Sequence, residues 1–247
     1  MRFLSSATAI GLALSLALTT PTAFAADYAR EKNWANEVLP SVMTGDPVWL
    51  ELSSGHKYLT LYTEAGDAKA GVIVMHGMGV HPDWGLVGPL RQNLPEQGYA
   101  TLSIQMPVLK AEAKGDAYPP TFDEAAERIK VALDFMAAKG YKKIVLASHS
   151  MGSRMTAHFL QRHPESAPAA WVVIGAPAAL DYSKLKFPVL DLYGENDLPQ
   201  VLKTANERAR GLRGKSAQIV APKADHFFEG KDAQLLELVK TYLDKTL

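Results

Sequence analysis

The segment that decides the fold is Lys143-Ile144-Val145-Leu146-Ala147-Ser148-His149-Ser150-Met151-Gly152, in which an apolar run meets a turn of small residues. The apolar run predicts a strand buried on both faces, and Met155 and Phe159 continue at helical spacing after the turn. A tight strand-to-helix turn exposes a serine hydroxyl at the edge of a sheet, beside free backbone N–H groups of the helix. The segment therefore predicts that Ser150 is the nucleophile of an acyl-transfer reaction.

Similar apolar runs alternate with helical patterns along the rest of the chain. These runs predict strands at Val48 to Leu52, Tyr58 to Tyr62, Gly71 to Met75, Ala100 to Ile104, Trp171 to Ile174, Val189 to Tyr193 and Ala217 to Val220. One helix is expected to begin at Thr121 with a capping box formed with Glu124, and to end at Gly140. The alternation predicts an α/β fold, with a mostly parallel central sheet and helices on both faces. The interval from Gly175 to Pro188 is too short for a helical cap over the sheet.

The first 25 residues differ from the rest of the chain. Arg2 precedes a largely apolar stretch, and Ala23-Phe24-Ala25 has the pattern of a processing site. We interpret residues 1–25 as a secretory signal peptide and residues 26–247 as one domain, exported to the periplasm or secreted. The alternative is an uncleaved membrane anchor, but the segment is short for a span, so no stable span is expected after processing.

Composition excludes several classes of partner. The chain has 247 residues, of which 47% are hydrophobic, and its formal net charge is zero at pH 7. The sequence has no basic stripe of the kind that binds nucleic acid, so no nucleic-acid partner is expected. The chain has no cysteine, so stability must come from a core that its length permits. The spacing of its histidines matches no zinc motif, so neither a metal nor another cofactor is expected. The oligomeric state is left open.

Two further residues complete a serine, acid and histidine order, each after a predicted strand. Asp197 follows the turn Gly194-Glu195-Asn196, and His226 follows the loop from Ala221 to Asp225. In an open parallel sheet, ligands bind at the carboxyl ends of the strands. His226 is therefore the expected general base, oriented by the Asp197 carboxylate. Glu195, Asp225 and the strand residue Asp191 are the alternatives for the acid.

The loop His76-Gly77-Met78-Gly79 follows another buried strand and is rich in glycine. Such a loop leaves its backbone N–H groups free to approach a substrate. We expect the oxyanion of the reaction to be stabilised by the backbone amides of Met151 and Met78.

These pieces, in this order, resemble the α/β-hydrolase superfamily over nearly all of residues 26–247. Ser148 departs from the pattern, because the family usually has glycine there. Within the superfamily, His76 to Trp84, Pro89 to Arg91 and Thr101 to Gln105 are similar to a little-characterised group of exported bacterial hydrolases. The resemblance implies a carboxylic-ester hydrolase with a small-molecule substrate. Thioesterase, amidase or peptidase, and acyltransferase activity on the same triad stay open, as does a non-catalytic binding protein.

Two features bear on the substrate. The segment from Met106 to Pro120 follows a strand end and is either a flap over the site or a plain surface connection. Trp84, Tyr118 and Phe227 are candidates for an apolar acyl pocket, and each fits the core equally well.

Overall fold

A computed structural model describes residues 26–247 of the chain, so the expected signal peptide lies outside the described residues. The strands are β1 (Asp46–Glu51), β2 (Lys57–Thr63), β3 (Ala70–Met75), β4 (Tyr99–Ile104), β5 (Ile144–His149), β6 (Ala170–Ile174), β7 (Val189–Asn196) and β8 (Ala217–Asp225). The α-helices are α1 (Tyr28–Val38), α2 (Val87–Asn93), α3 (Phe122–Ala138), α4 (Met151–Arg162), α5 (Pro199–Ala209) and α6 (Asp232–Thr246). Short 3₁₀ turns lie at Leu39–Ser41, Pro95–Gln97, Gly115–Ala117 and Pro119–Thr121.

All eight strands form one sheet in the order β1-β2-β4-β3-β5-β6-β7-β8. β2 pairs antiparallel with β1 and β4, and every other neighbouring pair is parallel. The expected α/β fold with a mostly parallel sheet is confirmed. The parallel strands end at the same edge, which is where the predicted site residues follow β3, β5, β7 and β8.

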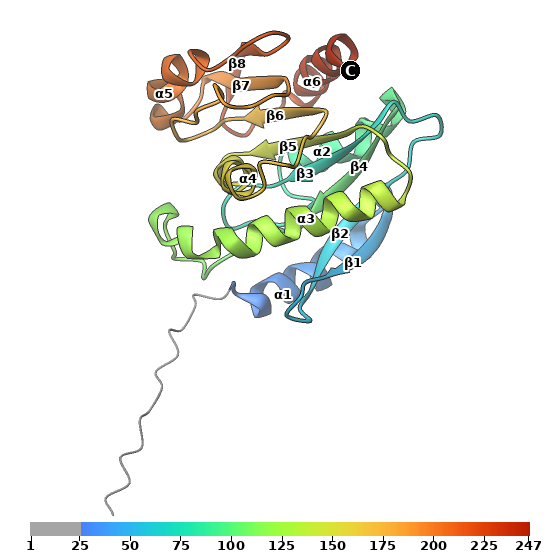
Figure 1. Ribbon diagram of the computed structural model, residues 1–247. Helices are drawn as coiled ribbons and strands as arrows, with labels where there is room; N and C mark the ends of the chain where they lie inside the picture. The colour runs from blue at the N-terminus through green and yellow to red at the C-terminus, as the bar shows by residue number, and fades with distance from the viewer. Residues whose placement is uncertain (1–25) are drawn as a thin grey trace, which may run out of the picture.

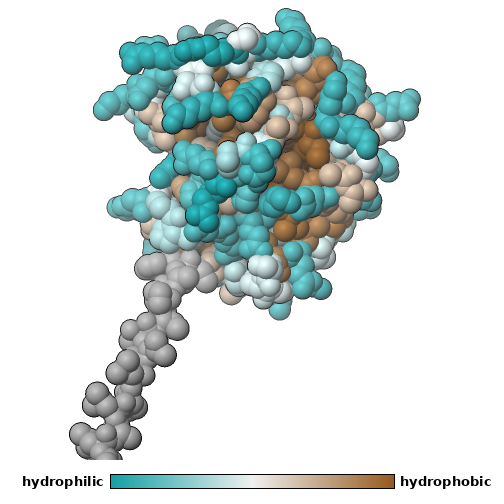
Figure 2. Space-filling view, viewed as in Figure 1, coloured by the Kyte–Doolittle hydropathy of each residue, from teal (hydrophilic) through white to brown (hydrophobic). Residues whose placement is uncertain are grey.

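Alternate residues of the central strands enter two separate cores. Ile73 and Met75 of β3 pack with α3 and α4 on one face, whereas Val72 and Val74 pack with α2 and α6 on the other. Figure 1 shows α3 and α4 in front of the sheet. Because both faces are covered, the strands are continuously apolar, as a buried parallel sheet requires. Figure 2 shows hydrophilic side chains over much of the outer surface, with a band of apolar residues between them.

The start of α3 differs from the prediction of a capping box. The Thr121 side chain makes no cap to the helix; its hydroxyl donates to the backbone oxygen of Tyr118 at 2.8 Å. Glu124 instead accepts from the Arg128 guanidinium and from the Tyr28 hydroxyl. A 3₁₀ turn directly before α3 already gives Thr121 helical backbone angles, and this geometry replaces the extended N-cap that the motif needs.

The ends of β7 and β8 also differ from the prediction. The residues expected to form a turn after Tyr193 and a loop after Val220 continue the two strands, and Asn196 pairs with Asp225. Gly194 makes this possible, because a Cβ on it would lie 2.4 Å from the backbone oxygen of Ala224. The longer ladder brings Asp197 and His226 out at neighbouring positions.

The interval between β6 and β7 contains no helix, in agreement with the expected absence of a helical cap. The segment from Met106 to Pro120 is fixed at both ends, because Met106 and Tyr118 are buried in the core that contains α3 and α4. Within residues 26–247, no helix has both the length and the apolar character that crossing a bilayer requires.

Candidate active site

Ser150 stands at a strained turn between β5 and α4. Its φ of +52° and ψ of −118° lie in a region that residues with a side chain rarely adopt. Such a conformation costs about 1–3 kcal/mol and persists only where the surroundings enforce it. Here the Ser150 N–H donates to the Ile174 oxygen of β6 at 2.9 Å, and α4 begins at the next residue. The turn aims the hydroxyl away from the sheet, toward the loop after β8.

Gly152 allows α4 to begin close to the loop after β3. A Cβ at this position would lie 2.6 Å from the His76 backbone oxygen and 3.0 Å from that of Met75. Ser148, the position at which the sequence departs from the resembled pattern, is buried. Its hydroxyl accepts from the Trp171 indole N–H at 2.8 Å and lies 3.2 Å from the Ser153 hydroxyl. The serine side chain therefore has its own polar partners and does not obstruct the turn.

The structure brings Ser150, His226 and Asp197 into one hydrogen-bonded row. The Ser150 Oγ lies 3.0 Å from His226 Nε2, and His226 Nδ1 lies 2.6 Å from Asp197 Oδ1. Asp197 is buried, and its carboxylate accepts from the backbone N–H groups of Leu198 at 2.7 Å and Gly194 at 3.2 Å. These donors fix the carboxylate, which fixes the imidazole. The geometry is that of a nucleophile, a base and an orienting acid.

The alternative acids lie elsewhere. Asp191 is fully buried and forms an ion pair with Arg208 of α5 at 3.0 Å. Glu195 accepts from the Lys223 backbone N–H, and Asp225 accepts from the N–H groups of Phe227 and Glu229. Each of these carboxylates therefore has a structural partner of its own.

Gly175, directly after β6, makes room for the imidazole. Its φ is +57°, and a Cβ there would lie 3.0 Å from two atoms of the His226 ring and 3.4 Å from Asp197 Oδ2. A side chain at this position would displace the histidine from the row. The sequence pattern did not single out Gly175, although its place at the end of a predicted strand is a usable signal.

His149 supports the loop that carries His226. Its Nε2 lies 3.0 Å from the His226 backbone oxygen, and the two rings lie 4.7 Å apart. Burial, together with the nearby His226, lowers the pKa of His149 to about 3, so the ring is neutral and Nε2–H is the donor. The sequence placed this histidine beside the nucleophile without giving it a role.

His76 orients the loop after β3. Its Nε2 accepts from the Met106 backbone N–H and faces the Gln105 side-chain amide, both at 2.9 Å. Burial lowers the pKa of His76 to about 3, so the neutral ring carries its proton on Nδ1 and donates to the Gly77 oxygen at 2.8 Å. The Gly77–Met78 peptide is trans, so the Met78 N–H points opposite to that oxygen.

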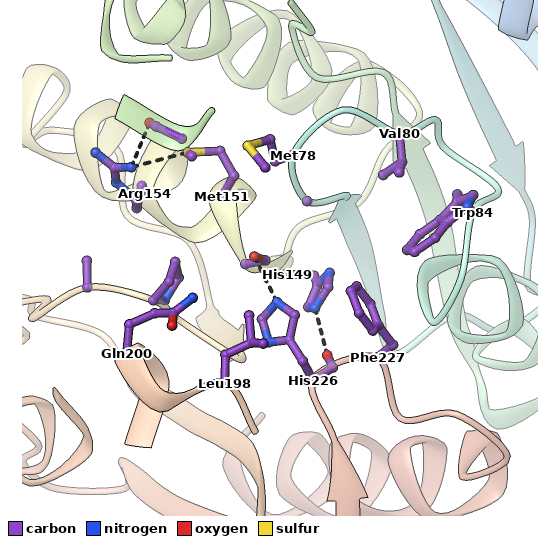
Figure 3. A pocket seen from close by; sticks show the side chains of 15 residues that line it. Met78, Val80, Trp84, His149, Met151, Arg154, Leu198, Gln200, His226 and Phe227 are labelled. Atoms are coloured by element: carbon purple, nitrogen blue, oxygen red, sulfur yellow. Dashed lines mark hydrogen bonds between the residues drawn. The ribbon is translucent and has the colours of Figure 1, made fainter. Parts of the chain in front are cut away.

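Ser150 and His226 open into a cleft of about 640 Å³ (Figure 3). Met78 and Met151, whose amides are the expected oxyanion donors, line the same cleft. Trp84 and Phe227 also line it and contact each other edge to face, with ring centroids 5.5 Å apart. Tyr118, the third candidate for an apolar pocket, is a core residue instead, and only 1% of its surface is exposed.

Comparison with known proteins supports the architecture. The model of a family described as a protein of unknown function (DUF3530) matches residues 7–127. No curated protein sequence matches the chain. Among solved structures, an α-β serine hydrolase homologue from Coxiella burnetii is similar with a TM-score of 0.64 and 20% identity, over 82% of this chain and 99% of that one.

Two further solved structures have the same architecture. A dienelactone hydrolase from Anabaena variabilis is similar with a TM-score of 0.68 and 22% identity, over 82% of this chain and 97% of that one. A member of the α/β serine hydrolases without a lid, from Xanthomonas campestris, is similar with a TM-score of 0.61 and 16% identity, over 83% and 96%. Together with the strand order and the turn at Ser150, these similarities show that the chain has the α/β-hydrolase fold.

Proposed function

We propose that the protein is a serine hydrolase that cleaves carboxylic esters through an acyl-enzyme on Ser150. The observation that carries this proposal is the row from Ser150 Oγ through the His226 ring to Asp197 at the floor of an open cleft. An unassisted serine hydroxyl is a weak nucleophile, and a base within hydrogen-bond distance activates it. The fold shared with solved hydrolases and with an esterase domain from Rhodothermus marinus agrees with this role.

In the proposed reaction, Ser150 Oγ attacks the ester carbonyl while its proton passes to His226 Nε2. The carbonyl oxygen becomes an oxyanion and accepts from the backbone N–H groups of Met151 and Met78. Collapse of this intermediate breaks the ester bond, and His226 returns the proton to the departing alcohol. Water then attacks the carbonyl carbon of the acyl-enzyme while His226 Nε2 accepts its proton. When the second intermediate collapses, His226 returns that proton to Ser150 Oγ, the acid is released and Ser150 is restored.

The oxyanion site is supported by two features. Met151 is the first residue of α4, where the backbone N–H groups have no partner within the helix. Met78 follows the peptide whose carbonyl is held by His76, so its N–H is directed away from that histidine. Removing one such donor costs about 10²–10³-fold in kcat in serine proteases, which is the scale expected here.

We further propose that residues 1–25 direct export and that the mature protein begins at Ala26. The test is subcellular fractionation of the full chain in a bacterial host, with N-terminal sequencing of the product. Export without cleavage would favour a membrane anchor, and retention in the cytoplasm would contradict the proposal.

The reaction is tested on protein beginning at Ala26 with p-nitrophenyl esters from acetate to palmitate, with Ser150→Ala in parallel. We expect hydrolysis by the wild type and activity near background in the variant, because the nucleophile and its acyl intermediate are lost. A fluorophosphonate probe should label the wild type at Ser150. Labelling without ester hydrolysis would favour thioesters, amides or acyl transfer, and absence of labelling in folded protein would favour a binding protein.

A further inference from the structure

Arg154 is a charged residue of the cleft that the proposed reaction does not use. It lies near the start of α4, four residues after Ser150, which directly precedes the helix. The Arg154 side chain is half-buried and lines the cleft that contains Ser150 and His226. Figure 3 shows Arg154 and Gln200 on one side of His226, and Trp84 and Phe227 on the other.

The guanidinium is held in place by neutral partners. One of its terminal nitrogens donates to the Gly115 backbone oxygen at 3.2 Å and lies 3.6 Å from the Met151 sulfur. Its central carbon lies 5.4 Å from the centroid of the Phe122 ring. Gly115 packs against the Met151 side chain, since a Cβ on it would lie 3.2 Å from that side chain. The guanidinium therefore has a defined position with donors still unused.

The charge of Arg154 has no local counterpart. Within residues 26–247 it forms no ion pair, whereas Arg91, Arg128 and Arg208 each pair with a carboxylate. None of the residues that line the cleft is acidic, and Asp197 lies behind the His226 ring. A fixed guanidinium at the end of a largely apolar cleft is a site for a carboxylate, which it binds with charge-assisted hydrogen bonds.

We propose that the substrate carries a carboxylate that binds Arg154 while its ester carbonyl lies at Ser150. This inference rests on the proposed ester hydrolysis and specifies its substrate class. Ser150 and Arg154 line one cleft and lie four residues apart in the chain, so short half-esters are suitable probes of this substrate class. The carboxylate belongs either to the acid part of the ester, as in a half-ester of a dicarboxylic acid, or to its alcohol part.

The experiment compares p-nitrophenyl hemiglutarate with p-nitrophenyl valerate, which have the same chain length and differ in the terminal carboxylate. A second pair, 4-carboxyphenyl valerate and phenyl valerate, places the charge on the alcohol side. The enzymes are the wild type, Arg154→Gln and the control Arg162→Gln, which changes an exposed arginine two turns further along α4. Comparing the wild type with each variant on the same ester cancels the intrinsic reactivity of that ester.

We expect Arg154→Gln to lower kcat/KM by about tenfold to a hundredfold for the charged ester of one pair, mainly through KM, and to change the neutral ester less than threefold. The pair that responds identifies the side that carries the carboxylate. Arg162→Gln should leave both pairs unchanged. Equal effects on charged and neutral esters, or no effect on either pair, would overturn the inference. Failure of the proposed function is recognised separately, by the absence of neutral-ester hydrolysis and of fluorophosphonate labelling in the wild type.

Discussion

At the scale of single residues, the candidate site depends on which ring nitrogen of each histidine carries a proton. Asp197, fixed by two backbone donors, faces His226 Nδ1 and so favours the tautomer that leaves Nε2 free to accept the Ser150 proton. His76 and His149 are neutral, because burial lowers the pKa of each ring to about 3. They hold backbone oxygens in place and do not exchange protons near neutral pH.

Asp197→Asn should reduce kcat by about 10⁴-fold on any p-nitrophenyl ester that the wild type cleaves, while the fold is retained. An asparagine amide that donates to Nδ1 leaves the proton on Nε2, where it blocks transfer from Ser150. Glu195→Gln is the matched control, because Glu195 is exposed and pairs only with the Lys223 backbone. If the control loses more activity than Asp197→Asn, the acid has been assigned to the wrong residue.

His76→Leu should lower kcat by about tenfold to a hundredfold with a smaller change in KM, because the Gly77–Met78 peptide loses the bond that orients it. His76→Asn places an amide N–H near the position of Nδ1 and should lose less. Steady-state kinetics together with thermal unfolding separates the two effects. A large fall in melting temperature with kcat unchanged would show that His76 has a structural role alone.

At the scale of elements, the site depends on how closely α4 approaches the loop after β3. Only a residue without a side chain at position 152 permits this contact. Gly152→Ala should lower the free energy of unfolding by about 1–3 kcal/mol and reduce kcat, because the added methyl group meets backbone oxygens that cannot move aside. Gly66→Ala is the control, since nothing lies within 4 Å of a Cβ there. Denaturant unfolding measures both, and equal stability of the two variants would contradict the argument.

At the scale of the whole molecule, α1 is joined to α3 through a cluster of buried charges. Glu31 of α1 and Glu124 of α3 share the Arg128 guanidinium, and His56 Nε2 lies 3.5 Å from Glu31. One cation neutralises one of the two carboxylates. Glu31 is the more enclosed of these two carboxylates. Burial raises its pKa to about 7, against the attraction of Arg128. Burial, together with the charge of Arg128, also lowers the pKa of the neighbouring His56.

This cluster predicts a dependence of stability on pH. A carboxyl whose pKa rises from about 4.5 in the unfolded chain to about 7 in the fold binds more protons when folded. The contribution of Glu31 to the free energy of unfolding is therefore fully present below pH 4.5. It is lost as the pH rises to 7 and above, and the total loss is about 3 kcal/mol. Glu31→Gln should gain stability relative to the wild type between pH 5 and pH 8, whereas exposed Glu37→Gln on the same helix should not. Parallel pH profiles for wild type and Glu31→Gln would refute this assignment.

Much of the architecture could be predicted from the sequence because it is encoded locally. Apolar runs and helical stripes alternate along the chain, and this alternation alone determines a mostly parallel sheet covered on both faces. The small-residue turn at Ser150 and the serine, acid, histidine order are likewise visible without any long-range contact. The prediction of a capping box at Thr121 was wrong. A 3₁₀ turn that the motif does not reveal ends at Thr121 and gives this residue helical backbone angles.

The tertiary structure decided what depends on contacts between distant segments. Asp197 and His226 meet because β7 and β8 pair further than their apolar runs extend, and that pairing depends on the space left by Gly194. The partners of His76 and His149, and the place of Arg154 in the cleft, depend on packing between elements that local pattern does not specify. Hydrophobic periodicity determines which face of an element is buried, but only the assembled fold determines which polar side chains then face one another.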